Sequence, residues 1–182
     1  MVFNTDLNIQ YNSLNSMSYR KFIADAMLGK LARWLRILGY DTLYFKDSED
    51  WKIIKIAKNE NRIILTRDRA LCKKAEKSSI DCFVVLPDDE IEKVLFLLSK
   101  KYGIVLEVNP DSSRCSECNG VLEKLDKNRW RCTKCKKEYW KGKHWETITE
   151  ILIRARSMKD TYGITKDRGG KQGKRNEVIE NS

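Results

Sequence analysis

Between residues 20 and 103 the chain alternates short apolar runs with segments in which apolar residues recur every three or four positions. The runs are KFIAD at 21–25, DTLYF at 41–45, RIILT at 62–66 and DCFVVL at 81–86. The recurring positions fall within 27–39, 48–60, 69–77 and 88–103. Runs of this length are typical of buried strands, and the recurring spacing indicates helices with one apolar face. The pattern therefore predicts four successive strand–helix units.

Two of these helices have a well-defined apolar face. In the helix at 27–39 the face comprises Leu28, Leu31, Ala32, Leu35 and Leu38, and Gly39 follows as a suitable C-terminal stop. In the helix at 48–60 we expect Trp51, Ile54 and Ala57, or near neighbours, to be buried. Strands that are apolar throughout and alternate with helices are typical of a parallel sheet covered on both faces. The pattern predicts a three-layer α/β/α domain with a mainly parallel sheet.

The patterning divides the whole chain into five segments. An Asn- and Ser-rich lead, expected to be mobile, precedes the α/β domain, which is followed by a cysteine-containing segment, a helix, and a Gly- and Lys-rich tail expected to be disordered. The predicted bounds are 1–18, 19–110, 111–143, 144–158 and 159–182. The helix carries Ile148, Ile151, Leu152 and Ala155 at helical spacing, so we expect it to dock on the α/β domain.

Four of the six cysteines have the spacing of a metal site. Cys115 and Cys118 form one C-x-x-C motif and Cys132 and Cys135 form another, with the thirteen residues 119–131 between them. This spacing predicts a small zinc ribbon in which four thiolates hold Zn²⁺ in a tetrahedral site. Four thiolates leave no open position for a substrate, so the zinc is expected to be structural.

Charge narrows the class of partner. The chain has 36 Lys and Arg against 26 Asp and Glu, a formal charge of +10, which favours a polyanion, above all nucleic acid, as the partner.

The first twenty residues lack the basic and apolar regions of a signal peptide, and the longest apolar run, at 94–98, is far shorter than the roughly 20 residues of a membrane span. We expect a cytoplasmic protein with no membrane partner. In that reducing compartment the isolated Cys72 and Cys82 are predicted to be buried thiols.

The cysteine-containing segment carries much of this charge. Residues 114–143 contain ten Lys and Arg and four acids, a net charge of +6. Aromatic residues are interleaved with these bases, as suits stacking on unpaired nucleotides beside bound phosphates. The RNA-binding candidates in this segment are Arg129, Trp130, Arg131 and Lys136, with Tyr139 as a further aromatic. For Trp140 we favour the alternative that it covers the zinc site or packs on the α/β domain. His144 is expected to cap or pack at the start of the last helix.

Carboxylates follow all four predicted strands. They are Asp25, the acids within 47–50, Asp68, and Asp88, Asp89 and Glu90. Because the carboxyl ends of parallel strands share one edge of a sheet, and the functional groove of such folds lies there, we expect these acids to converge. Ser48 and Asp88 also suit the role of helix N-caps. Asp25 and Asp68 come directly after apolar strands, and we favour them as site residues.

Converging carboxylates have a chemical consequence. Several ionised carboxylates in one site need a compensating cation, and hard oxygen ligands select Mg²⁺ or Mn²⁺. Such an ion activates water and orients a phosphodiester for hydrolysis. The chain contains one histidine, His144, which excludes a nuclease mechanism that uses two histidines.

Basic residues accompany the acids. Lys30, Arg33 and Arg36 recur every third residue on the flank of the first helix opposite its leucines, where they are placed to follow a phosphate backbone. A merely solvated helix face is the alternative. Arg67 adjoins Asp68 and is expected either to face backbone phosphate or to balance the acidic cluster.

Four stretches together resemble the Mut-seven C-terminal RNase domain family, a PIN-like nuclease family with an attached zinc ribbon. They are IADAMLGKLARWLRILGYDTLYF, RIILTRDRAL, RCSECNG and CTKCKKEYWKGKHW, and the resemblance spans roughly residues 20–157. The resemblance implies a PIN-like fold and metal-dependent ribonuclease chemistry, with Asp25 as the acid of the first strand and Asp68 in the T-x-D position. It leaves the other acids open between Asp47, Glu49 and Asp50 for one position, and Asp88 and Asp89 for the last.

The leading hypothesis is a Mg²⁺- or Mn²⁺-dependent endoribonuclease with Asp25, Asp68, Asp50 and Asp88 as catalytic acids. RNA is the expected partner, including ribosomal or other structured RNA, since a ribosome-assembly endonuclease also joins a PIN domain to a zinc ribbon, as an architectural analogy. A non-catalytic RNA-binding or ribosome-associated module with a degenerate site is the alternative. The nuclease of a toxin–antitoxin pair is disfavoured because such nucleases seldom carry a ribbon.

Overall fold

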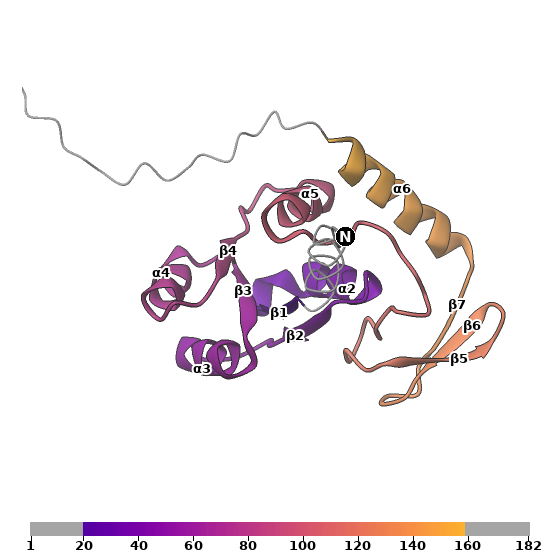
Figure 1. Ribbon diagram of the computed structural model, residues 1–182, viewed down its shortest axis with the longest axis horizontal. Coiled ribbons are helices and arrows are strands. Elements are labelled where there is room, and N and C mark those ends of the chain that lie inside the picture. The colour runs from indigo at the N-terminus through magenta and orange to yellow at the C-terminus, as the bar shows by residue number, and fades with distance from the viewer. Residues whose placement is uncertain (1–19, 159–182) are drawn as a thin grey trace, which may run out of the picture.

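A computed structural model describes residues 20–158 of the chain (Figure 1). The expected mobile lead at 1–18 and the expected disordered tail at 159–182 lie outside the described residues. No helix among the described residues is long and apolar enough to cross a membrane.

The first half of the described chain forms a parallel sheet with helices on both faces. Its elements in chain order are β1 (Lys21–Ala24), the 3-10 helix η1 (Ala26–Leu28), α2 (Gly29–Ile37), β2 (Asp41–Tyr44), α3 (Asp50–Glu60), β3 (Arg62–Thr66), α4 (Arg69–Lys77), β4 (Cys82–Val84) and α5 (Ile91–Tyr102). The four strands are all parallel, in the order β2-β1-β3-β4. In Figure 1, α2 and α5 lie on one side of the sheet and α3 and α4 on the other. The mixed α/β fold with a parallel sheet is confirmed.

Successive side chains of each strand lie on opposite faces of the sheet and pack in two separate cores. Phe22 and Ile63 pack with α2 and α5 in one core, whereas Ile23 and Ile64 pack with α3 and α4 in the other. All four of these side chains are buried. A strand that is buried on both faces must be apolar at every position, which explains the unbroken runs in the sequence.

The first helix follows its sequence pattern closely. The five residues of its predicted apolar face are all buried, and Trp34 is buried beside them. Gly39 ends the segment with a φ of +93°, and a Cβ at this position would lie 2.9 Å from the backbone oxygen of Ser112. Glycine is therefore needed here both for the left-handed conformation and for the close approach of the later chain.

The prediction for the second helix was wrong in part. Ala57 is buried as expected, but Ile53 takes the fully buried position next to it and Ile54 only packs against the core from the side. Trp51 is 56% exposed. It lies in the first turn of α3, beyond the reach of the sheet, where its indole Nε1 donates to Glu49 at 3.0 Å.

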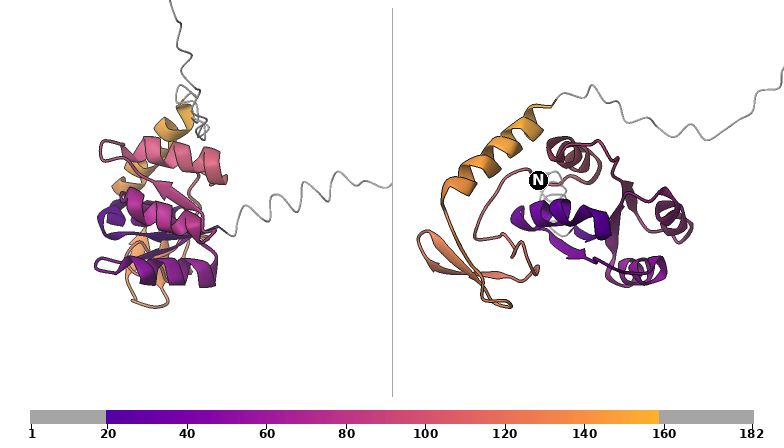
Figure 2. Two further views of the ribbon diagram at one scale, coloured as in Figure 1. Left: turned by 90° about the vertical axis from the view of Figure 1, so that its left-hand side faces the viewer. Right: turned by 180° about the vertical axis from the view of Figure 1, so that it is seen from behind.

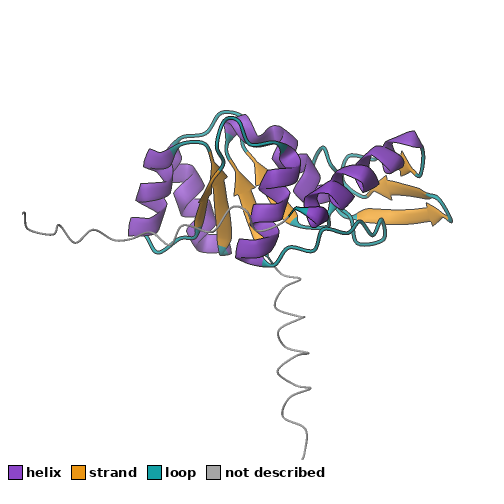
Figure 3. Ribbon diagram, turned by 90° about the horizontal axis from the view of Figure 1, so that it is seen from above, coloured by secondary structure: helices purple, strands orange, loops and turns teal. Residues whose placement is uncertain are grey.

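The second half of the described chain forms a small antiparallel sheet and a long helix. The strands are β5 (Leu122–Asp126), β6 (Arg129–Cys132) and β7 (Glu138–Trp140), in that order, followed by α6 (Lys143–Ser157). Seen from behind and from above, this sheet lies beside the β2 edge of the α/β domain (Figures 2 and 3). The helix returns to α5, where Leu152 and Ala155 are buried and Arg154 pairs with Glu92 at 2.8 Å. The predicted docking of this helix is confirmed.

The two isolated cysteines differ from the prediction in one respect. Cys72 and Cys82 are buried in the core under α3 and α4, as expected, but they form a disulfide rather than two free thiols. The crossover from α4 into β4 brings their Cα atoms to 5.5 Å, a separation that a disulfide can span. Sequence separation alone does not show that a helix and the next strand face each other at these two positions.

Candidate functional site

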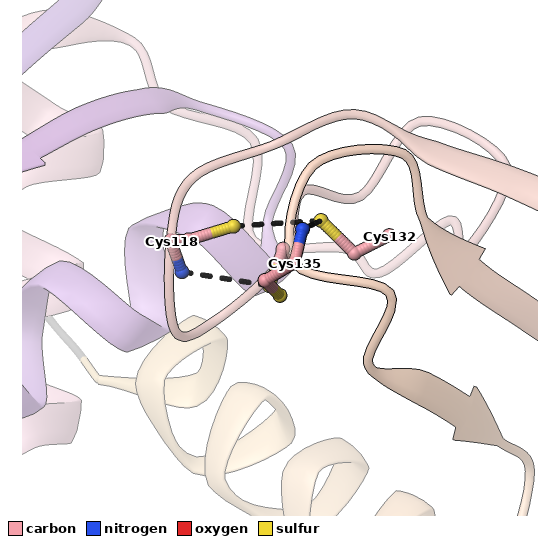
Figure 4. A group of neighbouring side chains, drawn as sticks. Cys118, Cys132 and Cys135 are labelled. Atoms are coloured by element: carbon pink, nitrogen blue, oxygen red, sulfur yellow. Dashed lines mark hydrogen bonds between the residues drawn. The ribbon is translucent and has the colours of Figure 1, made fainter.

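The four C-x-x-C cysteines come together at the base of the small sheet. Their Sγ atoms all lie within 4.8 Å of one another. Sγ of Cys115 is 3.5 Å from that of Cys135. Figure 4 shows Cys118, Cys132 and Cys135, with Sγ of Cys118 3.4 Å from that of Cys132. A tetrahedral site with Zn–S bonds of about 2.3 Å places its sulfurs roughly 3.8 Å apart. The cluster can therefore hold a metal such as zinc, and the segment is consistent with a small zinc ribbon.

The two turns that carry the cysteines explain this convergence. Backbone N–H groups point at the sulfurs, with the N–H of Cys118 donating to Cys115 and that of Cys135 to Cys132. Gly120 lies between the turns, where a Cβ would come within 2.7 Å of the Cys132 sulfur. Only a glycine lets the two turns approach closely enough for their sulfurs to share one ion.

Tyr139 completes the surroundings of the cluster. Its hydroxyl lies 3.0 Å from Sγ of Cys115. Burial alone would raise the pKa of Cys115, but hydrogen bonds from this hydroxyl and from backbone N–H groups outweigh burial and lower the pKa to about 6. A thiolate is the form that binds metal, so these donors favour metal loading at neutral pH.

A left-handed residue in the first turn attaches the ribbon to the α/β domain. Asn119, with φ +66°, donates from its amide to Asp41 at 2.7 Å and accepts from the backbone N–H of Thr42 at 3.0 Å. Asp41 also accepts from the buried Arg62 at 2.9 Å. Burial by itself would raise the pKa of Asp41, but the hydrogen bonds from Arg62 and Asn119 lower it overall. These contacts connect the ribbon to the starts of β2 and β3.

Arg36 does not have the exposed position that its spacing indicated. Its side chain is buried, and it donates to the backbone oxygens of Thr42 at 2.9 Å, Ser116 at 2.9 Å and Glu117 at 3.0 Å. Burial lowers the pKa of this guanidinium, although it stays protonated near neutral pH. Arg36 therefore joins α2, β2 and the ribbon, and its side chain is not available to a phosphate backbone.

Asp25 and Asp68 lie together at the carboxyl ends of the parallel strands, away from the ribbon, where the hydroxyl of Thr66 links them. Strands β1 and β3 are parallel neighbours with Ala24 opposite Leu65, so the residues that follow them lie side by side. The hydroxyl of Thr66 donates to Oδ2 of Asp25 at 2.9 Å and accepts from the backbone N–H of Asp68 at 2.9 Å. The two aspartates thus lie at one edge, as the sequence predicted.

Both aspartates also cap helices, which reverses the expected assignment of caps. Oδ1 of Asp25 accepts from the N–H of Ala26, and Oδ1 of Asp68 accepts from the N–H of Ala70, each at 2.6 Å. The residues that precede α3 and α5 are instead Glu49 and Glu90, and neither makes a side-chain capping bond. Ser48 and Asp88 are therefore not the caps. Each aspartate uses Oδ1 for the cap, and Oδ2 of Asp25 accepts from Thr66.

The remaining acids of this edge are arranged less favourably for a common ion. Asp50 pairs with Lys74 at 2.8 Å, and Asp50 and, more weakly, Asp68 raise the pKa of this lysine. Asp89 pairs with Lys93 at 2.7 Å, and Asp88 makes no hydrogen bond to another described residue. Within residues 20–158 the four cysteines are the one group of three or more potential ligands close enough to share an ion.

Other basic candidates remain at or near the surface. Lys30 and Arg33 are exposed on α2, and Arg33 lies 3.7 Å from Glu117 of the ribbon. Arg67 is partly buried, and its Nε has no hydrogen-bond partner among the described residues. Helix α2 begins beside Asp25 and ends at the ribbon, so its exposed face connects the acidic edge to the ribbon.

The two tryptophans of the ribbon have the opposite of their expected exposure. Trp130 is 4% exposed, with its indole Nε1 donating to Asp111 at 2.8 Å, so its ring does not lie open for stacking as predicted. Trp140 was expected to be covered, yet it is 69% exposed. Along β6 and β7 Trp130 pairs with Tyr139, and these two face the interior of the small sheet, which leaves Trp140 outward.

The basic candidates of the ribbon are exposed but partly engaged. Arg129 pairs with Asp126, and Arg131 donates to Glu138 at 2.8 Å across the strands. Lys136 has a φ of +64° at the tip of the second cysteine turn and is exposed. His144 is the second residue of α6 and is exposed, and the residue at the N-cap is Gly142, so the expected capping role of His144 was wrong.

The ribbon and the two aspartates lie at opposite ends of the parallel strands. The ribbon contacts the starts of the strands, whereas Asp25 and Asp68 follow their ends. At about 3.3 Å per residue, the four residues of β1 separate the two edges by roughly 13 Å. A partner that touches both must extend along the side of the domain.

Sequence reasoning missed several residues on which this arrangement depends. Thr66 stands in the T-x-D motif, and its alternation within β3 could have placed it next to Asp25. Asn119 has no such signal except its place directly after a C-x-x-C, where left-handed residues are common. The buried role of Arg36 had no signal at all, because it depends on a segment eighty residues later in the chain.

Comparison with known proteins gives one match. The model of the family described as "Mut7-C RNAse domain" matches residues 20–152. No curated protein and no solved structure matches the chain.

Proposed function

Because the chain belongs to the Mut7-C RNAse domain family, which indicates a nuclease-like or RNA-related role, we propose that it is a metal-dependent endoribonuclease. Its catalytic acids are Asp25 and Asp68, in a PIN-like α/β domain, and the zinc ribbon binds the RNA substrate. The observation that carries the proposal is the link between the two aspartates through Thr66, which fixes both at the carboxyl edge of adjacent strands.

The donor set at this edge suits a hard divalent cation. Mg²⁺ keeps several of its waters and is commonly held by one or two carboxylates together with phosphate oxygens of the substrate. Asp25 and Asp68 offer two carboxylates, and Oδ2 of Asp68 makes no hydrogen bond to another described residue. Mg²⁺ or Mn²⁺ held there would activate water and stabilise the leaving oxygen of a phosphodiester.

The protein's own groups have separate tasks. Thr66 donates to Asp25, which fixes the orientation of this carboxylate. Lys74 pairs with Asp50, and its positive charge offsets part of the repulsion among the carboxylates. In the proposed active state Asp50, and Asp88 on the neighbouring loop, add ligands from outside the Asp25–Asp68 pair.

The surface basic residues provide a path for the RNA backbone. Lys30 and Arg33 lie exposed along α2, which runs for nine residues between the acidic edge and the ribbon, about 14 Å. Beyond it the ribbon carries a net charge of +6 between residues 114 and 143. A single RNA strand bound along α2 reaches both regions, which fits phosphate contacts that position the substrate without reading its sequence.

The test compares cleavage and binding in matched charge variants. Asp25→Asn and Asp68→Asn each keep the side-chain oxygen that caps the helix and remove the negative charge. Asp81→Asn is the control, because Asp81 is an exposed aspartate at the opposite edge of the sheet, before β4. Each protein is incubated with structured RNA and Mg²⁺ or Mn²⁺, and RNA affinity is measured separately without added divalent ions.

We expect Asp25→Asn and Asp68→Asn to lower the cleavage rate by roughly 100-fold or more, with unchanged or slightly tighter RNA binding. Asp81→Asn should cleave like the unmodified protein. Equal cleavage by all four proteins would refute the assignment of the two aspartates.

One observation favours a second candidate function. Within the described residues no three carboxylates lie close enough to share an ion, which is what a non-catalytic RNA-binding module derived from a nuclease would show. In the same assay such a module binds RNA tightly and produces no cleavage with either metal ion.

A further inference from the structure

A cavity of about 480 Å³ lies where the ribbon, α6 and the segment between α5 and the ribbon meet. Its lining includes the aromatic rings of Tyr139, Trp140 and Trp145, the edge of the buried Trp130, and aliphatic side chains, with His144 beside them. Three of the chain's five tryptophans therefore line one cavity. The volume falls in the range of sites that enclose a small organic ligand. We call this space the aromatic cavity.

Trp140 is an exposed part of the wall whose position is nonetheless held. It is 69% exposed, which is unusual for a tryptophan next to a folded core. A Cβ on Gly142 would lie 3.3 Å from its indole Nε1, so the ring packs directly against the glycine backbone. An exposed ring that is fixed from one side presents its other surfaces at little cost in conformational entropy.

Cations lie next to these rings. Nζ of Lys137 is 5.9 Å from the centre of the Tyr139 ring, and Nζ of Lys141 is 5.4 Å from that of Trp145. Arg114 and Lys143 also line the cavity, and Lys143 forms no salt bridge with a carboxylate of the described chain. The walls are thus largely apolar. Lys137 pairs with Glu117 at 3.1 Å and Glu138 of the lining pairs with Arg131, which leaves Lys141 and Lys143 as the basic side chains beside the rings that form no salt bridge within the described chain.

We propose that the aromatic cavity holds an unpaired base of an RNA strand, with neighbouring phosphates on Lys141 and Lys143. This inference rests on the proposed function in that RNA is the partner. Every base has a π face, so aromatic walls accept it without regard to sequence, and nearby cations neutralise the backbone on either side. An apolar peptide would fill the walls equally well but would leave Lys141 and Lys143 without an anionic partner.

The position of the aromatic cavity fits a remote anchor for the substrate. Ile37, the last residue of α2, lines it. The exposed basic face of α2 therefore runs from the acidic edge to the cavity. A base held there fixes the strand without approaching Asp25 or Asp68.

The test uses the zinc-loaded full chain and two labelled single-stranded RNA oligomers of equal length, one with adenine bases and one with abasic sites throughout. Binding is followed by fluorescence anisotropy without added Mg²⁺ or Mn²⁺, so that cleavage does not interfere. The variants are Trp140→Ala, Trp145→Ala and Trp140→Phe. Trp51→Ala is the matched control, since Trp51 is also largely exposed but lies on α3, outside the cavity. Zinc content and far-UV circular dichroism verify the fold of each variant.

The unmodified chain should bind the adenine oligomer about 5- to 150-fold more tightly than the abasic one, as expected for one stacked base. Trp140→Ala and Trp145→Ala should reduce this ratio toward one, Trp140→Phe should retain most of it, and Trp51→Ala should leave it unchanged. Equal affinity of the unmodified chain for both oligomers would overturn the proposal, as would an undiminished ratio in both alanine variants.

The outcome separates this inference from the proposed function. A protein that cleaves RNA but binds both oligomers equally lacks the base site and keeps the nuclease assignment. A protein that prefers the adenine oligomer but never cleaves keeps the base site and loses the nuclease assignment. If an apolar peptide, and no oligomer, protects the cavity tryptophans from quenching, the occupant is a protein segment and the proposal fails.

Discussion

Replacing Arg36 by methionine tests whether this side chain holds the zinc-loaded ribbon to the α/β domain. The guanidinium donates to three backbone oxygens that belong to β2 and to the first cysteine turn. Methionine keeps much of the length and apolar volume of the side chain but donates no hydrogen bond. The substitution therefore removes the contacts and leaves the packing of α2 largely in place.

The expected cost follows from the burial of the three oxygens. Thr42 is fully buried, so its carbonyl finds no replacement donor and costs about 1–3 kcal/mol. The carbonyls of Ser116 and Glu117 are only partly buried, and water can reach them, so together they add about 1 kcal/mol. The free energy of unfolding should fall by roughly 2–4 kcal/mol, which corresponds to a decrease in Tm of roughly 5–15 °C for a chain of this size.

Arg33→Met is the matched control on the same helix. Arg33 is 62% exposed and makes one ion pair, at 3.7 Å, with Glu117. Such a surface pair contributes less than about 1 kcal/mol. Urea unfolding of the zinc-loaded proteins, followed by tryptophan fluorescence and circular dichroism, measures both changes, and a chelator chase measures how fast each variant releases zinc. If Arg36→Met loses no more stability than Arg33→Met and holds zinc as firmly, Arg36 does not join the two parts.

Further measurements test the other contacts. Removing zinc with a chelator should unfold the ribbon while the parallel sheet keeps its circular dichroism signal, because metal binding provides much of the folding free energy of such a small unit; loss of both signals together would contradict this. Since the pKa of Asp41 is lowered in the folded chain, its ionised form stabilises the fold above its unfolded pKa, and this contribution is lost as the pH falls through the lower folded value. The stability difference between the unmodified chain and Asp41→Asn should thus be present at pH 6 and shrink below about pH 4, whereas a constant difference would exclude the mechanism. Replacing both Cys72 and Cys82 by alanine should cost about 2–3 kcal/mol in urea unfolding under oxidising conditions, and a reducing agent should bring the unmodified chain close to the variant. Gly39→Ala should destabilise the chain by more than about 1 kcal/mol, because its φ is positive and the added methyl group would meet the oxygen of Ser112; an unchanged Tm would show that the later chain moves away without cost.

The sequence by itself determined the layers of the fold. The consecutive apolar residues Ile63, Ile64 and Leu65 of β3 require burial on both faces, and the leucine spacing of α2 requires a covered helix, so both follow from local patterns. The sequence also predicted the four-cysteine cluster, because each C-x-x-C turn brings its own two sulfurs together and the two turns are close in the chain. The meeting of Asp25 and Asp68 at one edge also followed from the parallel order of the strands.

Only the tertiary structure decided which side chains face solvent where distant segments meet. Arg36 lies on the predicted flank of its helix, but the ribbon covers that flank, and a basic residue placed for phosphate becomes a buried structural contact. Trp130 and Trp140 exchange roles because the pairing of β6 with β7 fixes which ring turns inward. The packing of distant segments against one another likewise determines the caps of α3 and α5, the Cys72–Cys82 disulfide and the aromatic cavity. Periodicity indicates which face of a helix or strand is apolar and buried. Which segments cover the remaining faces depends on the free energy of packing between elements, and a local sequence pattern does not contain this information.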